Sequence, residues 1–195
     1  TGCRYQIRNK RMTYLKSLPD DAKVYNVFAS RPALYEPFTE VCEQIMRGPS
    51  PLSRGDRELI GAFVSALNSC PYCHDVHNEA VQAYGIDAEL ARRLTEDIET
   101  AAVEDRMKPL FVLVRKATEG AYRVTQADFD WAYEQGWDDD AIHDAIVVAC
   151  LFNFMNRFVS TLGIEADEVY LAAAGPRLRD EGYASSLNKT MGKVG

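Results

Sequence analysis

The residues of this chain best suited to chemistry are two cysteines, Cys70 and Cys73, which are followed four positions later by His77. The pair stands at the predicted start of a helix, because Pro71 suits the first turn, where no backbone donor is needed. Unpaired N–H groups at a helix start carry partial positive charge, so the pKa of a thiol placed there falls. A second cysteine three positions away can close a disulfide without large backbone movement. The pair can therefore cycle between a dithiol and a disulfide.

Histidine is the first candidate for moving the thiol proton. His77 shares a helical face with Cys73, since residues four apart are neighbours on a helix. An imidazole can take a thiol proton or return it, as general acid–base catalysis requires. His74 is adjacent to Cys73 and points elsewhere, which makes it a weaker candidate.

A carboxylate is the fourth candidate. Glu58 lies within a mostly apolar helix, beside Ala62 and Ser65. At a helix crossing it would be costly to bury unless it were paired. Pairing with His77, directly or through water, would remove that cost and orient the imidazole. Taken alone, such a residue is more often an ordinary surface carboxylate.

The cysteine pair by itself leaves both redox chemistry and metal binding open. Zinc needs four ligands, and Cys70, Cys73, His77 and a distant fourth residue are conceivable. No second C-x-x-C motif is present to complete a standard zinc site. No phosphate loop or dinucleotide fingerprint is found either. We therefore expect neither a bound metal nor a cofactor.

The three remaining cysteines are spaced too widely to form a disulfide framework with the pair. Cys150 lies in the most apolar stretch, so we expect it to be an inert core thiol, and Cys42 to be similar. We expect Cys3 to be exposed. His143 stands among aspartates and is expected at the surface.

The elements that must position these residues are predicted to be helices. Leu34, Phe38, Val41 and Ile45 recur at helical spacing over 32–47. Ser53 and Asp56 form a capping-box pattern at the start of the next helix, which runs to about 68. Gly85 ends the helix that starts near the cysteine pair. Further helices are expected at 87–98, 106–118, 125–135, 138–162 and 165–174.

Few stretches alternate with period two, so the predicted fold class is all-α. The stretch from Ala145 to Met155 is apolar nearly all round, which places its helix centrally in the core. Asn153 and Asn156 interrupt it, and we expect them at a helix crossing or a subunit interface. The chain reads as a single domain over 1–195, with an N-terminal arm at 1–24 and, after Gly175-Pro176, a polar tail at 176–195.

Composition narrows the classes of partner. Of 195 residues, 47% are hydrophobic and 26% charged, which is enough apolar material for one domain core. The net charge of -7 makes nucleic acid a poor partner. No apolar run approaches the roughly 20 residues that a bilayer needs. With no stretch resembling a signal peptide, we expect a cytoplasmic protein that does not act at a membrane.

The pattern of Glu58, eleven residues, then Cys70-x-x-Cys73-x-x-x-His77 resembles the active site of alkylhydroperoxidase D (AhpD)-like proteins. These belong to the carboxymuconolactone decarboxylase superfamily. The residues around the pattern, 52–58 and 65–73, resemble the branch named peroxidase-related proteins. The resemblance extends over roughly residues 25 to 175.

The resemblance implies an AhpD-like helical bundle that forms homo-oligomers and reduces hydroperoxides or exchanges disulfides. Carried over by position, Cys73 attacks the peroxide and forms a sulfenic acid, and Cys70 resolves it as a disulfide. Glu58 and His77 move protons, and a thiol or lipoyl-type donor restores the dithiol. The best-known members have a second histidine where this chain has Tyr72. Tyrosine, with a pKa near 10, does not replace that base.

Two other functions stay open. One is an acid–base enzyme on the same scaffold, such as a lactone decarboxylase, whose chemistry needs no thiols. The other is a non-enzymatic oligomer in which the cysteine pair senses oxidation. In each case we expect a homo-oligomer, because the apolar residues of the helices exceed what one core of this size hides.

Overall fold

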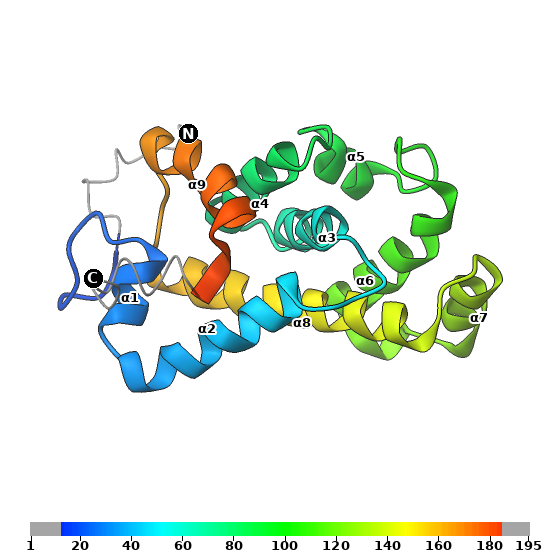
Figure 1. The fold of residues 1–195 in the computed structure, drawn as a ribbon, viewed down its shortest axis with the longest axis horizontal. Coiled ribbons are helices and arrows are strands. Elements are labelled where there is room, and N and C mark those ends of the chain that lie inside the picture. The colour runs from blue at the N-terminus through cyan, green and yellow to red at the C-terminus, as the bar shows by residue number, and fades with distance from the viewer. Residues whose placement is uncertain (1–12, 185–195) are drawn as a thin grey trace, which may run out of the picture.

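Helices make up the regular structure of this protein in the computed structural model, which describes residues 13–184 (Figure 1). No strand occurs within that range, so the expected all-α class is confirmed. The α-helices are α1 (Val24–Ala29), α2 (Pro32–Arg47), α3 (Arg54–Leu67), α4 (Pro71–Ala83), α5 (Leu90–Glu96), α6 (Lys108–Gly120), α7 (Gln126–Glu134), α8 (Asp139–Leu162) and α9 (Glu168–Asp180). Two short 3₁₀ helices, Asp105–Met107 and Ala121–Arg123, flank α6.

The longest helix, α8, runs along the long axis of the molecule (Figure 1). The Asp138 carboxylate accepts from the Ala141 N–H at its start, and Gly163, with a φ of 66°, ends it, as the sequence predicts. By length and composition α8 alone among the described helices is apolar enough to cross a membrane. Leu151 and Phe152 are nevertheless buried against other helices, as in the core helix of a globular bundle.

Helix α8 lies centrally in the bundle as expected, but one of its faces is exposed. Its Cys150 is exposed, not a core thiol, and Phe154 is half exposed. The neighbouring helices α2, α3, α4 and α6 contact α8 on its other sides. Cys42 is buried as expected, and burial raises its pKa to about 12.

Helix α3 crosses α8 in the centre of the bundle and is buried over most of its length. The predicted capping box is present: the Ser53 hydroxyl accepts from the Asp56 N–H at 3.1 Å, and the Asp56 carboxylate accepts from the Ser53 N–H at 3.0 Å. Gly61 lies at the crossing, where a Cβ would stand 2.4 Å from the Phe152 ring. The glycine therefore allows the two helices their close approach.

A tight turn joins α3 to α4 and delivers the cysteine pair. Ser69 adopts a φ of 52°, in the left-handed region, which is uncommon for a residue other than glycine. The Cys70 N–H donates to the Ser65 carbonyl at 3.0 Å, so the chain folds back onto the end of α3. Cys70 thus becomes the N-cap of α4, and Pro71 occupies the first turn as predicted.

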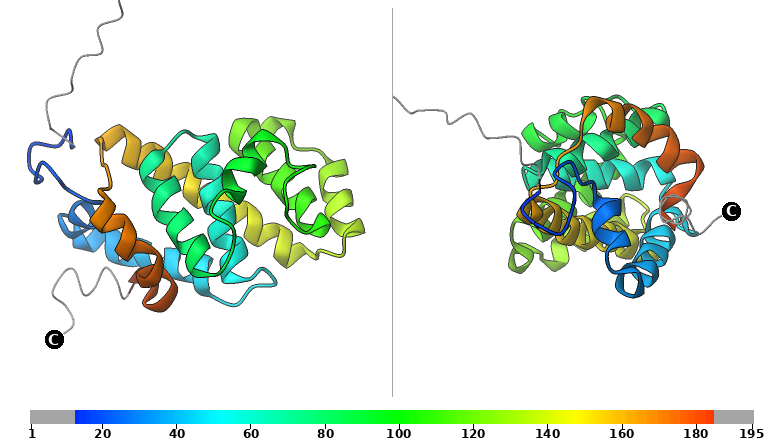
Figure 2. Two further views of the ribbon diagram at one scale, coloured as in Figure 1. Left: turned by 90° about the horizontal axis from the view of Figure 1, so that it is seen from above. Right: turned by 90° about the vertical axis from the view of Figure 1, so that its left-hand side faces the viewer.

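The C-terminal helix differs from the prediction. We expected it to end near 174, but α9 continues through Gly175 and Pro176 to Asp180. Gly175 lies against the α4 backbone, where a Cβ would be 2.3 Å from the Glu79 carbonyl oxygen, so this glycine serves close packing and not a helix end. Seen from above, α4 lies between α3 and α9 (Figure 2).

Residues 176–184 are therefore folded and do not form the expected polar tail. Arg47 of α2 donates to the carbonyl oxygens of Leu178 and Arg179 at 2.7 and 2.6 Å, which satisfies the end of α9. The Glu43 carboxylate accepts from the Tyr183 N–H at 2.6 Å. The rest of the tail, 185–195, and residues 1–12 of the expected arm lie outside the described residues.

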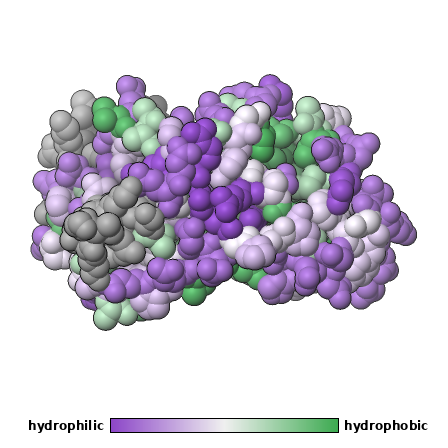
Figure 3. Space-filling view, viewed as in Figure 1, coloured by the Kyte–Doolittle hydropathy of each residue, from purple (hydrophilic) through white to green (hydrophobic). Residues whose placement is uncertain are grey.

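The described part of the arm, 13–23, carries no helix, in line with the prediction. It is tied to the loop before α9 through Lys23, which donates to the Glu165 carbonyl at 3.0 Å and pairs with Asp167 at 2.9 Å. Helix α1, which follows, was not predicted, and it buries Val27 and Phe28. On the face seen in Figure 3 the surface is mostly hydrophilic, with hydrophobic residues in small groups.

Candidate active site

The two cysteines of the pair are reduced and buried, with exposures of 1% for Cys70 and 3% for Cys73. Hydrogen bonding from the Cys73 thiol lowers the pKa of Cys70 to about 6, against burial, and the Ser160 hydroxyl and the Asn156 amide add to this effect. Hydrogen bonding to Cys70, burial and the charge of Cys70 raise the pKa of Cys73 well above its ordinary value. In the resting site Cys70 is therefore the thiolate, and Cys73 keeps its proton.

The candidate proton carriers are brought into direct contact. Glu58 is 2% exposed, and its Oε2 lies 2.7 Å from Nδ1 of His77. A carboxylate accepts, so Nδ1–H is the donor and Nε2 is left for another partner. The edge of the Phe152 ring packs on the imidazole, with centroids 4.5 Å apart. The predicted pairing of Glu58 with His77 is thus present without a bridging water.

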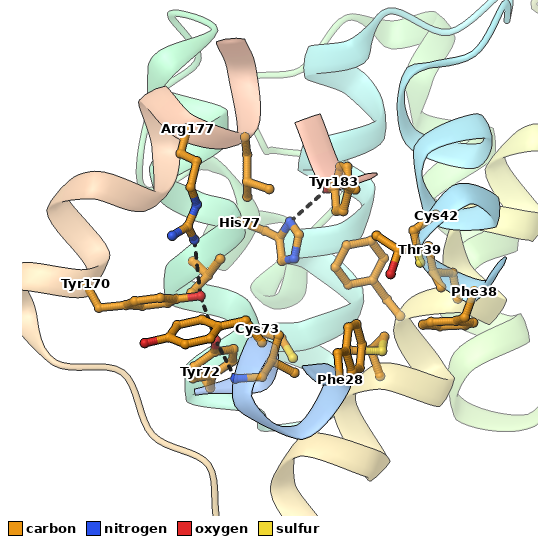
Figure 4. Close-up of a pocket in the computed structure, with 17 residues that line it drawn as sticks. Phe28, Phe38, Thr39, Cys42, Tyr72, Cys73, His77, Tyr170, Arg177 and Tyr183 are labelled. Carbon is orange, nitrogen blue, oxygen red and sulfur yellow. Dashed lines mark hydrogen bonds between the residues drawn. The ribbon is translucent and has the colours of Figure 1, made fainter. Parts of the chain in front are cut away.

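A mostly apolar cavity opens beside this pair, between α1, α2, α4, α8 and α9 (Figure 4). Cys73 and His77 both line it, whereas Cys70 borders a second cleft near Ser69 and Ser160. The two sulfurs therefore face different spaces. Seventeen described residues line the cavity, namely Val24, Tyr25, Phe28, Phe38, Thr39, Cys42, Tyr72, Cys73, Val76, His77, Leu151, Phe152, Met155, Tyr170, Arg177, Leu178 and Tyr183.

Part of this sequence matches a known protein family, and the fold is similar to solved structures. The sequence model of the carboxymuconolactone decarboxylase family matches residues 32–105, which include Glu58, both cysteines of the pair and His77. An uncharacterized peroxidase-related protein from Silicibacter sp. TM1040 has a similar structure, with a TM-score of 0.75 and 25% identity over 87% of this chain and 99% of that one. Over residues 32–105 this chain is therefore similar to the carboxymuconolactone decarboxylase family, and its fold is similar to that of a peroxidase-related protein.

A second solved structure shares this fold. It is described as an alkylhydroperoxidase AhpD core, an uncharacterized peroxidase-related protein from Ralstonia eutropha JMP134. It is 23% identical over 77% of this chain and 79% of that one, with a TM-score of 0.69. No curated protein matches the sequence significantly.

The site contains one residue, Tyr183, that no sequence pattern indicated. The Tyr183 hydroxyl donates to Oε1 of Glu58 at 2.8 Å, and its ring lies nearly parallel to that of His77, with centroids 6.2 Å apart. Burial and the Glu58 charge raise the pKa of Tyr183 well above its ordinary value, so it stays a donor. No spacing pattern connects positions 58 and 183, and Tyr183 falls in the segment we expected to be a tail.

Helix α8 adds two more residues to the site. Asn156 is 1% exposed, donates to the Ser65 hydroxyl at 2.9 Å and accepts from the Asn68 amide at 2.9 Å. Ser160, one turn later, faces the same sulfur, Cys70. The sequence predicts Asn156 at a helix crossing, which is confirmed, but gives no sign that it reaches the cysteine pair.

The other histidines lie outside this arrangement. His74 contacts the Asp75 carboxylate at 2.9 Å, and His143 is exposed beside Asp144, as expected. Within residues 13–184 no group of three or more His, Cys, Asp or Glu side chains is arranged to hold a metal ion. Tyr72, which replaces the second histidine of the best-known members, donates to the Tyr170 hydroxyl at 2.9 Å.

Proposed function

We propose that this protein is a thiol-dependent hydroperoxide reductase that uses Cys70 and Cys73 as a redox pair. The observation that carries the proposal is a buried dithiol with one lowered pKa, placed beside a Glu58–His77 pair at the wall of an apolar cavity. The superfamily is one of enzymes, and the similar structures are named peroxidase-related although uncharacterized.

The first step takes place at Cys73, because this sulfur and His77 line the same cavity. His77 accepts the Cys73 proton, and the thiolate attacks the terminal oxygen of the hydroperoxide. The S–O bond forms as the O–O bond breaks, which leaves a sulfenic acid on Cys73 and an alkoxide. The alkoxide takes the proton from His77 and departs as the alcohol. Glu58 stabilises the imidazolium in between.

The second step uses the thiolate of Cys70. It attacks the sulfenic sulfur of Cys73, the disulfide forms, and hydroxide leaves and is protonated by solvent as water. The lowered pKa of Cys70 keeps this sulfur ionised at neutral pH. A thiol or lipoyl-type dithiol then donates two electrons, restores the dithiol and is itself oxidised to a disulfide. The cleft beside Cys70 gives this donor a path separate from the peroxide cavity.

Peroxide consumption with a dithiol donor tests the proposal. We expect Cys73→Ser to abolish turnover and Cys150→Ser, which changes an exposed thiol, to leave it unchanged. In Cys70→Ser, a sulfenic acid that reacts with dimedone should accumulate on Cys73 and be located by peptide mass spectrometry. Full turnover by Cys73→Ser would refute the mechanism. A sulfenic acid on Cys70 in that variant would reverse the roles of the two sulfurs.

An acid–base reaction without thiols is the second candidate, since the Glu58–His77 pair is complete without either sulfur. Lactone decarboxylation that survives alkylation of both cysteines would favour it. A non-enzymatic redox sensor is the third, and an oxidation-dependent gel shift with no peroxide turnover would favour that role.

A further inference from the structure

The cavity beside Cys73 has two unlike ends (Figure 4). One end is apolar and is bounded by the rings of Phe28 and Phe38. The other end is bounded by Tyr170 and Arg177 of α9. Cys73 lies between the two ends. The middle of a ligand that filled the cavity would therefore lie next to the Cys73 sulfur.

Arg177 brings a positive charge to this cavity. It is the only Asp, Glu, Lys or Arg side chain among the described residues that line it. Its guanidinium lies 4.9 Å from the centre of the Tyr170 ring and donates to the Tyr170 hydroxyl at 3.1 Å. Within the described range it forms no ion pair, and its Nε is buried without a hydrogen-bond partner. A cation beside apolar walls without a carboxylate is costly to maintain.

The Tyr170 hydroxyl strengthens the donor character of this end. It accepts from the Tyr72 hydroxyl at 2.9 Å and from Arg177 at 3.1 Å. The Tyr72 oxygen in turn accepts from the Val24 N–H at 3.4 Å. Because a tyrosine oxygen has two acceptor sites, Tyr170 is left with its own hydrogen to donate. This end of the cavity therefore offers N–H and O–H donors and one positive charge.

We infer that the cavity binds a carboxylic acid with a long apolar body. The carboxylate accepts from Arg177 and Tyr170, since a planar guanidinium pairs well with a carboxylate. The apolar body extends toward Phe28 and Phe38. If the chain is the hydroperoxide reductase proposed above, the hydroperoxide group of its substrate lies part-way along the apolar body, at the position next to Cys73. It does not lie at the far end of the body from the carboxylate.

Binding without turnover tests this site directly. Calorimetric titration of the reduced protein should show that octanoate binds and that Arg177→Met weakens it by roughly tenfold or more, the effect of losing a charge-assisted hydrogen bond. Arg177→Lys should restore part of the affinity. Octan-1-ol should bind wild type and Arg177→Met equally. The control is Arg179→Met, an exposed arginine that pairs with Asp180 outside the cavity.

Octanoate that fails to bind wild type, or that binds Arg177→Met as well as wild type, would overturn the inference. A circular-dichroism spectrum and melting curve for each variant show whether a loss of binding comes from misfolding.

Kinetics with a long-chain hydroperoxy acid and its methyl ester separate this inference from the proposed function. Arg177→Met should raise KM for the acid by a much larger factor than KM for the ester. If KM for the acid and KM for the ester rose equally in Arg177→Met, the carboxylate site would be overturned, while the proposed peroxidase function would stand. Octanoate binding that depends on Arg177, with no peroxide turnover by wild type, would keep the carboxylate site and refute the peroxidase.

Discussion

Tyr183, Glu58 and His77 form a chain of hydrogen bonds with the carboxylate in the middle. The order of these three groups decides where a proton can go. Oε1 of Glu58 accepts from Tyr183, and Oε2 accepts from His77. Both oxygens of the buried carboxylate therefore have a donor, as the burial of a charge requires. With Nδ1 committed to Glu58, the other imidazole nitrogen is the one free to exchange a proton with Cys73.

Tyr183→Phe should slow peroxide turnover by about tenfold while the fold is retained, because Glu58 loses one donor and the imidazole orientation loosens. The aromatic ring that lies parallel to His77 is kept in this variant. The pH profile of kcat should shift as well, which loss of packing alone would not cause. Tyr122→Phe is the matched control, since Tyr122 is 90% exposed. An unchanged profile in Tyr183→Phe would exclude Tyr183 from the proton path.

At the scale of elements, α9 carries the two residues at the charged end of the cavity and leads directly to Tyr183. Its position depends on Gly175, where the helix touches the α4 backbone. A methyl group there must displace either helix, because the nearest atom is a carbonyl oxygen and not a flexible side chain.

Gly175→Ala should lower the free energy of unfolding by about 1–3 kcal/mol, the usual cost of overpacking. Urea denaturation followed by circular dichroism measures this change. Octanoate binding should weaken too, because Arg177 and Tyr170 move with α9. Ala173→Ser, on the exposed face of the same helix, should change stability little. A stable Gly175→Ala variant that binds normally would show that α9 does not depend on this contact.

Local sequence signals predicted most of the fold. The Ser53 capping box, Pro71 and Gly163 each act on the nearest turn, so their effects can be read without the tertiary structure. Gly175-Pro176 led to the wrong prediction of a helix end, because the glycine makes contact with a helix almost a hundred residues earlier in the chain. The hydrogen bond from Tyr183 to Glu58 joins the site across a longer separation of 125 positions.

The pattern of candidate site residues could be read from the sequence, whereas Tyr183 could not. Cys70, Cys73 and His77 lie on one helix, where spacing fixes which side chains are neighbours. Glu58 on the preceding helix entered through the resemblance as well as through its apolar surroundings. Nothing in the order of residues tells which of the two sulfurs is ionised, because that depends first on which thiol donates the hydrogen bond between them and then on a donor, Ser160, from a distant helix.

The whole molecule leaves an apolar face on α2 and α8. Leu34, Val41 and Phe154 are 56%, 52% and 50% exposed, and Phe154 packs against Phe38 between them. Exposed apolar residues that adjoin in this way are typical of an interface. We propose that the homo-oligomer expected from the sequence forms through this face.

Replacing both Val41 and Phe154 by lysine should reduce the mass in solution to that of one chain, 21.9 kDa, because charged side chains oppose burial of the face. Light scattering coupled to size exclusion measures the mass. Val169→Lys is the control, since Val169 is 83% exposed on α9, and it should leave the assembly intact. A wild-type protein that already runs as one chain would contradict the proposal.

The proposed redox chemistry depends on the charge of the Cys70 sulfur, and the ultraviolet absorbance of the thiolate measures this charge without a reagent that must enter the site. We predict that the absorbance of the reduced wild type, minus that of Cys70→Ser, rises with a midpoint near pH 6, where the pKa of Cys70 is expected. Cys70 absorbance that appears only in the range of an ordinary cysteine, or at still higher pH, would contradict the proposed redox pair.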